Sequence, residues 1–246
     1  MLVKILIISH TFFIMIVHRI LKGITFGSNY GSPGFAASYL IQTVNKNILF
    51  DVGHNGLRNV IVNELQRHGL SPKSIDIVIL SHDHWDHVMN YSMFDNSRFI
   101  IGYASESGRN GDWAYVPLLG EKLKEMDTLF VKKADVVHCE GVKIISVPGH
   151  TEGDIAAVIE NSKEIGVFTG DTIPSMNAFR QSKPDLIFYS VEEASKSYRY
   201  LQSFSPTLIY PGHDAPFRLK PMKYVFEKDH MEGVISGNIE LNFEIK

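Results

Sequence analysis

Residues 81–87 read SHDHWDH, which places three histidines and two aspartates within six consecutive positions. The stretch follows IDIVIL at residues 75–80, a fully apolar run that is typical of a sheet strand covered on both faces. His82 and His84 alternate by two, so an extended segment can point both the same way. Asp86 and His87 come after a turn and can aim at a second point nearby. Alone, the stretch could also be a solvated turn, so a metal site requires further ligands elsewhere in the chain.

Three more strand-like segments end on side chains that can bind metal. VKIISV is followed by His150, EIGVFT by Asp171 and TLIY by His213, and a glycine precedes each of these three residues. Glycine lets the backbone turn sharply as it leaves a strand, so the next side chain can aim back over the sheet edge. Ligands in open sheets tend to lie just beyond the carboxyl ends of the strands. We therefore expect the four strand ends to form one rim.

The seven side chains divide into two sets of three and one shared carboxylate. The predicted ligands are, for one ion, His82, His84 and His150; for the other, Asp86, His87 and His213; and, between them, Asp171. Two ions about 3.5–4 Å apart can hold a hydroxide between them. Imidazole and carboxylate suit zinc, and they also suit iron and manganese. The predicted cofactor is a pair of divalent ions, zinc in the first place, with iron or manganese as alternatives.

The rest of the chain predicts helices packed outside β-sheet layers. Apolar residues at helical spacing predict a helix within residues 56–69, and Ser190 with Glu193 is typical of the start of a helix that runs to about Phe204. Residues 1–23 suggest two buried strands, because charged and histidine residues interrupt them too often for a membrane span. No linker-like composition divides the 246 residues, so we expect a single domain over 1–220 and a strand-like extension of it over 221–246.

The composition indicates which binding partners and which cellular compartment to expect. The formal net charge of −3 disfavours a general nucleic-acid surface, and the single cysteine, Cys139, favours the reducing cytoplasm. We expect a small-molecule substrate, no nucleic acid and no membrane. The strand-like tail could pair with a second chain to form a homodimer, or it could complete a sheet of its own chain.

The combination of motifs resembles the metallo-β-lactamase superfamily. SHDHWDH is similar to that family's H-x-H-x-D-H motif, and PGHT, TGD and PGHD contain His150, Asp171 and His213 in the family's order. The resemblance implies an α/β fold, the αββα sandwich of two β-sheets flanked by helices, with a dinuclear site at the sheet edges. FDVG at residues 50–53 resembles the motif whose aspartate supports the ligands, which implies that role for Asp51.

The predicted chemistry is hydrolysis by a metal-bridging hydroxide, with Asp86 as the catalytic group that carries a proton to the leaving group. A small ester, lactone or thioester is the first substrate class, because the ligand set looks like that of lactonase and glyoxalase-II-like members. Quorum-quenching lactonases commonly carry a tyrosine three residues after the bridging aspartate, whereas this chain has Pro174. The alternatives are a phosphodiesterase or nuclease of the same superfamily, or a mononuclear iron dioxygenase.

The substrate wall is harder to place from sequence. Residues 102–130 are polar and glycine-bearing at first and then amphipathic, so we expect part of a pocket wall or lid there. The predicted substrate contacts are Trp113, Tyr115, Phe179 and Arg180. Trp85 is expected to pack beneath the site or at its mouth, and Asp83 is expected to make local hydrogen bonds.

Overall fold

The computed structural model describes residues 15–24, 26–28, 34–161, 164–182, 184, 186–225 and 243–245. Of the two strands expected near the N-terminus, one is present as β1 (Ile16–Leu21), and the other falls on residues outside the described part of the chain.

The first sheet has six strands in the order β1-β3-β4-β5-β6-β7, and its last four strands run parallel. A hairpin about residues 45–47 joins β3 to β4 in antiparallel pairing. The apolar run IDIVIL supplies β5, which is buried along its whole length between β4 and β6. Beyond β1, the strands of this sheet are β3 (Ser38–Gln42), β4 (Asn47–Phe50), β5 (Ile77–Leu80), β6 (Arg98–Gly102) and β7 (Thr128–Val131).

The second sheet has seven strands in the order β14-β13-β12-β11-β10-β9-β8, and only β11 and β12 are parallel neighbours. The three segments that precede His150, Asp171 and His213 are its strands β9, β11 and β12. The strands are β8 (Val136–Cys139), β9 (Val142–Ser146), β10 (Ile155–Glu160), β11 (Ile165–Gly170), β12 (Leu208–Pro211), β13 (Phe217–Leu219) and β14 (Met222–Tyr224).

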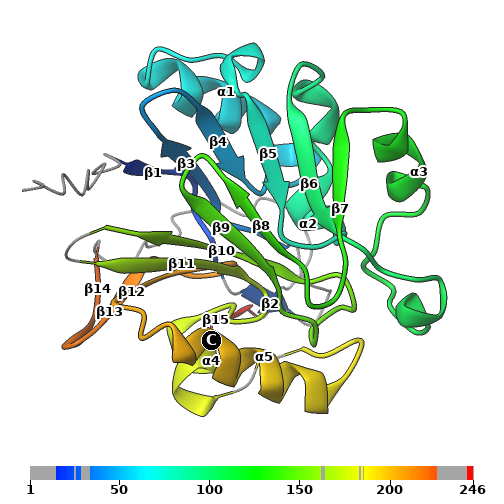
Figure 1. Ribbon diagram of the computed structural model, residues 1–246, viewed down its shortest axis with the longest axis vertical. Coiled ribbons are helices and arrows are strands. Elements are labelled where there is room, and N and C mark those ends of the chain that lie inside the picture. Colours follow the sequence, from blue (N-terminus) through cyan, green and yellow to red (C-terminus); the bar gives the residue numbers. More distant parts are fainter. Residues whose placement is uncertain are drawn as a thin grey trace, which may run out of the picture.

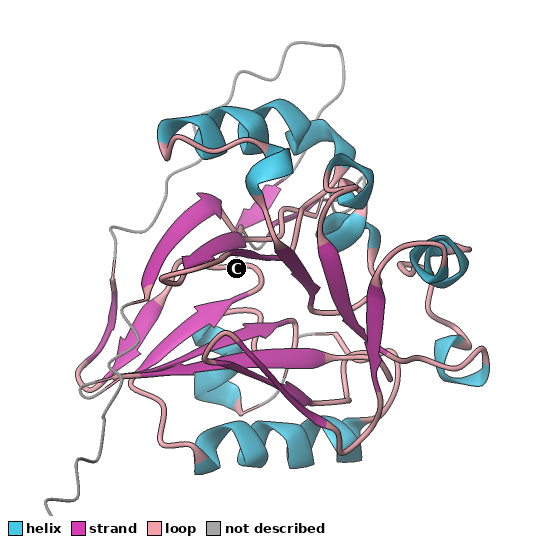
Figure 2. Ribbon diagram, turned by 45° about the horizontal axis from the view of Figure 1, so that its top comes forward, coloured by secondary structure: helices cyan, strands magenta, loops and turns pink. Residues whose placement is uncertain are grey.

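Helices cover the outer faces of both sheets, so the layers follow the order helix, sheet, sheet, helix (Figures 1 and 2). The predicted helices near 56–69 and 190–204 are confirmed as α1 and α5, and the Ser190 hydroxyl caps α5 by accepting from the Glu193 N–H. The α-helices are α1 (Arg58–Arg67), α2 (Trp85–Val88), α3 (Leu119–Lys124), α4 (Met176–Gln181) and α5 (Val191–Ser203).

Three hydrophobic cores fill the spaces between these layers. Side chains alternate along each strand, so β5 sends Val78 and Leu80 toward α1 and α3, and Ile77 and Ile79 toward the second sheet. A third core lies between the second sheet and the helices α4 and α5, and includes Tyr198. This is the αββα sandwich that the sequence predicts.

The described parts of the C-terminal tail pair within the chain. β14 completes the edge of the second sheet beside β13, and β15 (Phe243–Ile245) pairs antiparallel with β2 (Phe26–Ser28). Within the described ranges, no helix combines the length and the apolarity that crossing a bilayer requires.

Candidate metal centre

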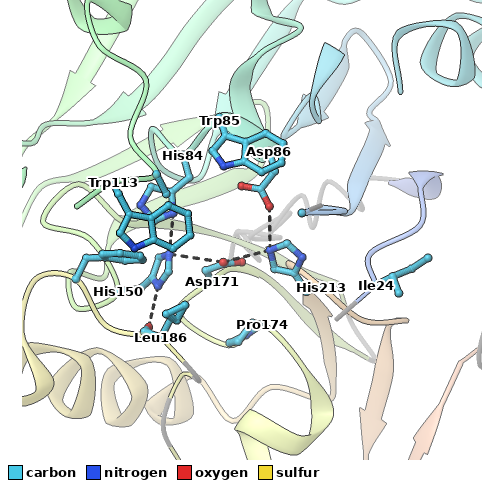
Figure 3. Close-up of a pocket in the computed structure, with 13 residues that line it drawn as sticks. Ile24, His84, Trp85, Asp86, Trp113, His150, Asp171, Pro174, Leu186 and His213 are labelled. Carbon is cyan, nitrogen blue, oxygen red and sulfur yellow. Dashed lines mark hydrogen bonds and ion pairs between the residues drawn. The ribbon is translucent and has the colours of Figure 1, made fainter. Parts of the chain in front are cut away.

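The seven side chains singled out by the sequence meet in one buried place at the edges of the two sheets. Figure 3 labels His84, Asp86, His150, Asp171 and His213 among them. The loop after β5 and the helix α2 carry four of them, and the loops after β9, β11 and β12 carry the other three. Glycine is required at two of these turns. Gly170 has φ of +49°, and a Cβ there would meet the side chain of Ser81. A Cβ on Gly212 would meet the Asp171 carboxylate, so a larger residue would push that carboxylate away.

Each of the five histidines turns one ring nitrogen outward to a protein acceptor. The Nδ1–H of His150 donates to the Leu186 carbonyl at 2.8 Å, and the Nδ1–H of His213 donates to the Phe35 carbonyl at 3.1 Å. A carbonyl oxygen only accepts, so these rings must carry a proton on that nitrogen. The remaining outer contacts are His87 Nδ1 to Asp51 Oδ2 (2.8 Å), His82 Nδ1 to Ser81 Oγ (2.9 Å) and His84 Nε2 to Asp112 Oδ2 (2.9 Å).

The inner ring nitrogens face one another across short gaps. His84 Nδ1 lies 3.1 Å from His150 Nε2, and His87 Nε2 lies 3.3 Å from His213 Nε2. In a ring that carries one proton, the outer contact holds that proton on the outer nitrogen, so the inner nitrogen has a lone pair to offer a cation. The inner nitrogen of His82, Nε2, is buried and has no hydrogen-bond partner in the described part of the chain. A cation at these positions would satisfy lone pairs that otherwise repel one another.

Asp171 lies between the two histidine pairs. Its Oδ2 is 3.6 Å from His150 Nε2 on one side and 3.2 Å from His213 Nε2 on the other (Figure 3). Its Oδ1 is buried, lies 3.4 Å from His87 Nε2 and has no hydrogen-bond partner among the residues that the structure describes. One carboxylate therefore reaches both halves of the cluster, as a bridging ligand requires.

Burial and mutual contact set the charge states in the cluster. Burial lowers the pKa of His150 to about 4, although Asp171 opposes that shift. Burial also lowers the pKa of His82 well below its ordinary value, and the neighbouring His87 adds to the effect. Burial would raise the pKa of Asp171, but His213 and His87 outweigh it and hold that pKa well below the ordinary range. Burial would lower the pKa of His87 and of His213, but the neighbouring carboxylates, Asp171 first, outweigh it and raise both. Divalent metals bind neutral imidazoles and ionised carboxylates, so an ion that binds at these two rings displaces protons.

The geometry fits a metal centre. The donor atoms form three groups, and within each group they lie no more than 4.8 Å apart. The groups are His82, His84 and His150; His82, His87 and Asp171; and Asp86, His87 and His213. The first and third groups are the two sets that the sequence predicts. Histidine nitrogens turned inward by outer hydrogen bonds, together with carboxylate oxygens, are typical ligands of zinc and of related divalent ions.

The Asp51 carboxylate accepts hydrogen bonds from two residues of the cluster's first loop and helix, Ser81 and His87. Asp51 sits at the end of β4 with φ of +57°, and its Oδ1 accepts the backbone N–H of Ser81 at 2.7 Å. Its Oδ2 accepts the Ser81 hydroxyl and the Nδ1–H of His87, each at 2.8 Å. Asp51 thus orients His87 directly and, through Ser81, His82.

A pocket of about 170 Å³ opens above the cluster. Its floor is made by ligand candidates, and its walls carry mainly apolar and aromatic side chains. The Phe188 ring packs edge-on against the rings of His84 and Trp113, with centroid distances of 5.1 Å and 5.6 Å. The lining residues are Ile24, Gly34, His84, Trp85, Asp86, Trp113, Ala114, His150, Asp171, Pro174, Leu186, Phe188 and His213.

The predicted substrate contacts divide between the pocket and other places. Trp113 lines the mouth and is 71% exposed. The Tyr115 ring lies outside the pocket, beneath the guanidinium of Arg109. Phe179 and Arg180 do not line the pocket, because both lie on α4: Phe179 packs against the third core, and Arg180 Nε reaches Met222 Sδ. A separate cavity of about 520 Å³, away from the cluster, has Phe179 in its wall.

The structure adds residues that the sequence did not single out. Asp112 is buried and accepts from the ring of His84, and the Leu186 carbonyl and Phe188 lie beside His150. None of them follows a strand end or belongs to a histidine-rich motif. Asp83 makes the local contact expected of it, since its Oδ2 accepts from Arg109 Nε at 2.8 Å.

Comparison with known proteins agrees with the fold. The model of the metallo-beta-lactamase superfamily matches residues 31–213, which span every predicted ligand. A probable metallo-hydrolase of Methanocaldococcus jannaschii is 33% identical over 192 residues, covering 73% of this chain and 88% of that protein. The chain belongs to the metallo-beta-lactamase superfamily, and it is a metal-dependent hydrolase of that superfamily.

More distant relatives include lactonases. An N-acyl homoserine lactonase of a Bacillus species is 29% identical over 163 residues, covering 63% of this chain and 62% of the lactonase. Among solved structures, a putative metallo-beta-lactamase of Thermotoga maritima superposes with a TM-score of 0.64 at 19% identity, over 83% of this chain and 99% of that one. The B. thuringiensis protein AiiA, as a mutant with N-decanoyl-L-homoserine at its active site, also gives 0.64, at 22% identity, over 80% and 92%. These structures share the fold.

Proposed function

We propose that this protein is a two-ion hydrolase that cleaves a small ester, lactone or thioester bearing an apolar group. The observation that carries the proposal is the set of inward-facing donors described above. His84 and His150 turn ring nitrogens toward each other, and so do His87 and His213. Among the described residues, the buried Oδ1 of Asp171 has no hydrogen-bond partner. Such an arrangement is costly in a protein interior unless cations fill it.

The residues would hold two ions. His82, His84 and His150 would hold one, Asp86, His87 and His213 would hold the other, and Asp171 would contact both. When bound, divalent ions such as zinc supply a nucleophile from water at neutral pH and polarise the oxygen of the bond to be broken.

Asp86 is the group best placed to move a proton. Its carboxylate lines the pocket, and its Oδ2 lies 3.4 Å from His213 Nε2. A carboxylate at the pocket floor can take a proton from the attacking water and deliver it to the leaving oxygen or sulfur of the substrate. The other carboxylate at the floor, Asp171, faces His87, His150 and His213, so it holds the centre together instead.

The wall of the pocket indicates the kind of substrate. Five side chains of the wall present apolar surface to a bound molecule: Ile24, Trp113, Pro174, Leu186 and Phe188. Such a wall stabilises an uncharged hydrocarbon or aromatic group by removing it from water. The lactonases among the relatives make lactones with an apolar side chain the first compounds to test.

The experiment is a hydrolysis screen with metal content measured on the same sample. Lactones, carboxylic esters, thioesters, phosphodiesters and β-lactams are offered to protein loaded with zinc, manganese or iron. We expect turnover of a lactone, ester or thioester that disappears in Asp171→Asn together with bound metal. Asp127→Asn is the matched control, because the Asp127 carboxylate is exposed and pairs with Arg98 at the surface. Absence of metal binding, preferential cleavage of phosphodiesters, or oxygen-dependent turnover with iron would each contradict the proposal.

A further inference from the structure

Asp112 binds one of the ligand histidines from outside the cluster. Its side chain is 2% exposed, and its Oδ2 lies 2.9 Å from His84 Nε2. Its Oδ1 accepts the backbone N–H of Ala114 at 2.9 Å, which fixes the orientation of the carboxylate. Both oxygens are thus engaged, and one of them is directed at the ring nitrogen of His84 that points away from the cluster.

This contact decides which nitrogen of His84 carries the proton. With the proton on Nε2, Nδ1 keeps its lone pair toward His150 Nε2, 3.1 Å away. If the acceptor were removed, the proton could move to Nδ1 and form an N–H···N hydrogen bond to His150. That bond would occupy the lone pairs of both rings, and it would close the position that an ion needs.

Asp112 belongs to a segment, residues 109–116, that is fastened along the metal-binding loop; we call it the strap. The Trp85 N–H donates to the Ala114 carbonyl at 3.0 Å, and the Val116 N–H donates to the Asp83 carbonyl at 2.9 Å. The strap therefore holds Asp112 at a fixed place beside the SHDHWDH loop.

The next residue of the strap, Trp113, forms the mouth of the pocket. Its ring packs against Phe188, whose ring in turn packs against His84 at 5.1 Å. Two consecutive residues thus serve the same ligand from two sides: Asp112 holds the outer nitrogen of the His84 ring, and Trp113 contacts the aromatic ring that covers it.

We propose that Asp112 is a positioning residue that selects the metal-binding tautomer of His84, and so controls the ion held by His82, His84 and His150. This inference rests on the proposed two-ion centre. It assigns Asp112 no contact with the substrate, and it predicts that the ion held by Asp86, His87 and His213 is little affected by changes at Asp112.

The test compares Asp112→Ala and Asp112→Asn with the wild type, and uses Asp127→Ala as a matched carboxylate removal far from the centre. Cobalt and zinc affinities are measured by competition with a coloured chelator. Removing the outer partner of a ligand histidine typically weakens metal binding by about 10- to 100-fold. We expect that loss for one ion in Asp112→Ala and less than about a threefold change for the other. Asp112→Asn should fall between wild type and Asp112→Ala, because an amide oxygen still accepts the Nε2 proton.

A second readout reports the tautomer itself. In nitrogen-15 spectra of the metal-free protein, the His84 proton should sit on Nε2 in the wild type and move to Nδ1 in Asp112→Ala. Excess metal should restore the activity of that variant. The inference is overturned if Asp112→Ala keeps the wild-type tautomer, binds both ions as wild type does, or loses both ions equally. If the wild type binds no metal, the proposed function fails; if it binds two ions and only the Asp112 results differ from expectation, this inference alone fails.

Discussion

The Asp51 carboxylate accepts the Nδ1 proton of His87 at 2.8 Å, deep beneath the cluster. The same oxygen, Oδ2, accepts the hydroxyl of Ser81, and Oδ1 accepts the Ser81 backbone N–H. Asp51 and His87 are both essentially fully buried, so the contact between them is shielded from water. A buried carboxylate of this kind fixes the histidine tautomer and makes the inner nitrogen a better donor to metal.

Replacing Asp51 should therefore weaken metal binding at a residue that touches no ion. For Asp51→Ala we expect an affinity lower by about 10- to 100-fold, and lower stability, because the buried donors lose their acceptor. Asp51→Asn should be milder, since asparagine tolerates the left-handed backbone conformation found here (φ +57°) and still accepts one proton. Metal titration followed by circular dichroism separates the two effects; wild-type affinity in Asp51→Ala would contradict the assigned role.

The aromatic mouth should govern affinity for apolar substrates. Trp113 lies at the pocket mouth and is 71% exposed, so a bound apolar group would cover it. We expect Trp113→Ala to raise KM about three- to tenfold for substrates with a long apolar group, with little change in kcat, because that contact is the same in the ground and transition states.

Trp113→Phe should retain most of the affinity, since the ring contact with Phe188 can be kept. Tyr115→Phe is the control, because Tyr115 lies on the same segment but does not line the pocket. The measurement is steady-state kinetics across a series of acyl chain lengths. Equal KM changes for short and long chains would rule out the mouth as an apolar contact.

A pair far from the centre offers a pH test of stability. Asp76 accepts from Lys46 Nζ and from the Asn47 N–H, each at 2.9 Å. Burial alone would raise the pKa of Asp76, but these two donors outweigh it and lower that pKa. The pair therefore stabilises the fold above the ordinary carboxyl pKa, and the benefit is lost as pH falls through the lowered pKa.

Asp76→Asn should lower the free energy of unfolding at pH 7 by about 0.5–1 kcal/mol, a modest amount because both side chains are about a third exposed. The difference between variant and wild type should shrink as the pH falls. Urea unfolding at a series of pH values checks this, and a difference that stays constant or grows in acid would refute the assignment.

Sequence reasoning located the ligand candidates because they obey a local rule. His150, Asp171 and His213 each follow a strand and a glycine, and strand ends of one fold meet at one edge. Asp112 obeys no such rule: it lies 28 residues beyond His84, in a loop whose path depends on tertiary contacts. The spacing of charged residues in that loop carries no signal of the contact.

Phe179 was expected in the pocket wall from the sequence, but it lies elsewhere in the structure. Its closeness to Asp171 in sequence suggested a pocket wall, but the chain turns at Ser175, whose hydroxyl accepts from the Ala178 N–H and starts α4. The helix then directs Phe179 toward Tyr198 and Phe217 in the third core. An amphipathic helix buries its apolar face against the sheet beneath it, so nearness in sequence to a ligand did not decide where this ring lies.

We propose that seven side chains on four strand ends form one two-ion centre. A titration of chelator-stripped protein with zinc or cobalt, with bound metal and hydrolysis followed together, tests this directly. We expect two ions per chain, activity that rises with occupancy, and loss of both in Asp171→Asn, because that carboxylate reaches His150 and His213 at once. A plateau at less than one ion per chain, or full metal binding and activity in Asp171→Asn, would contradict it.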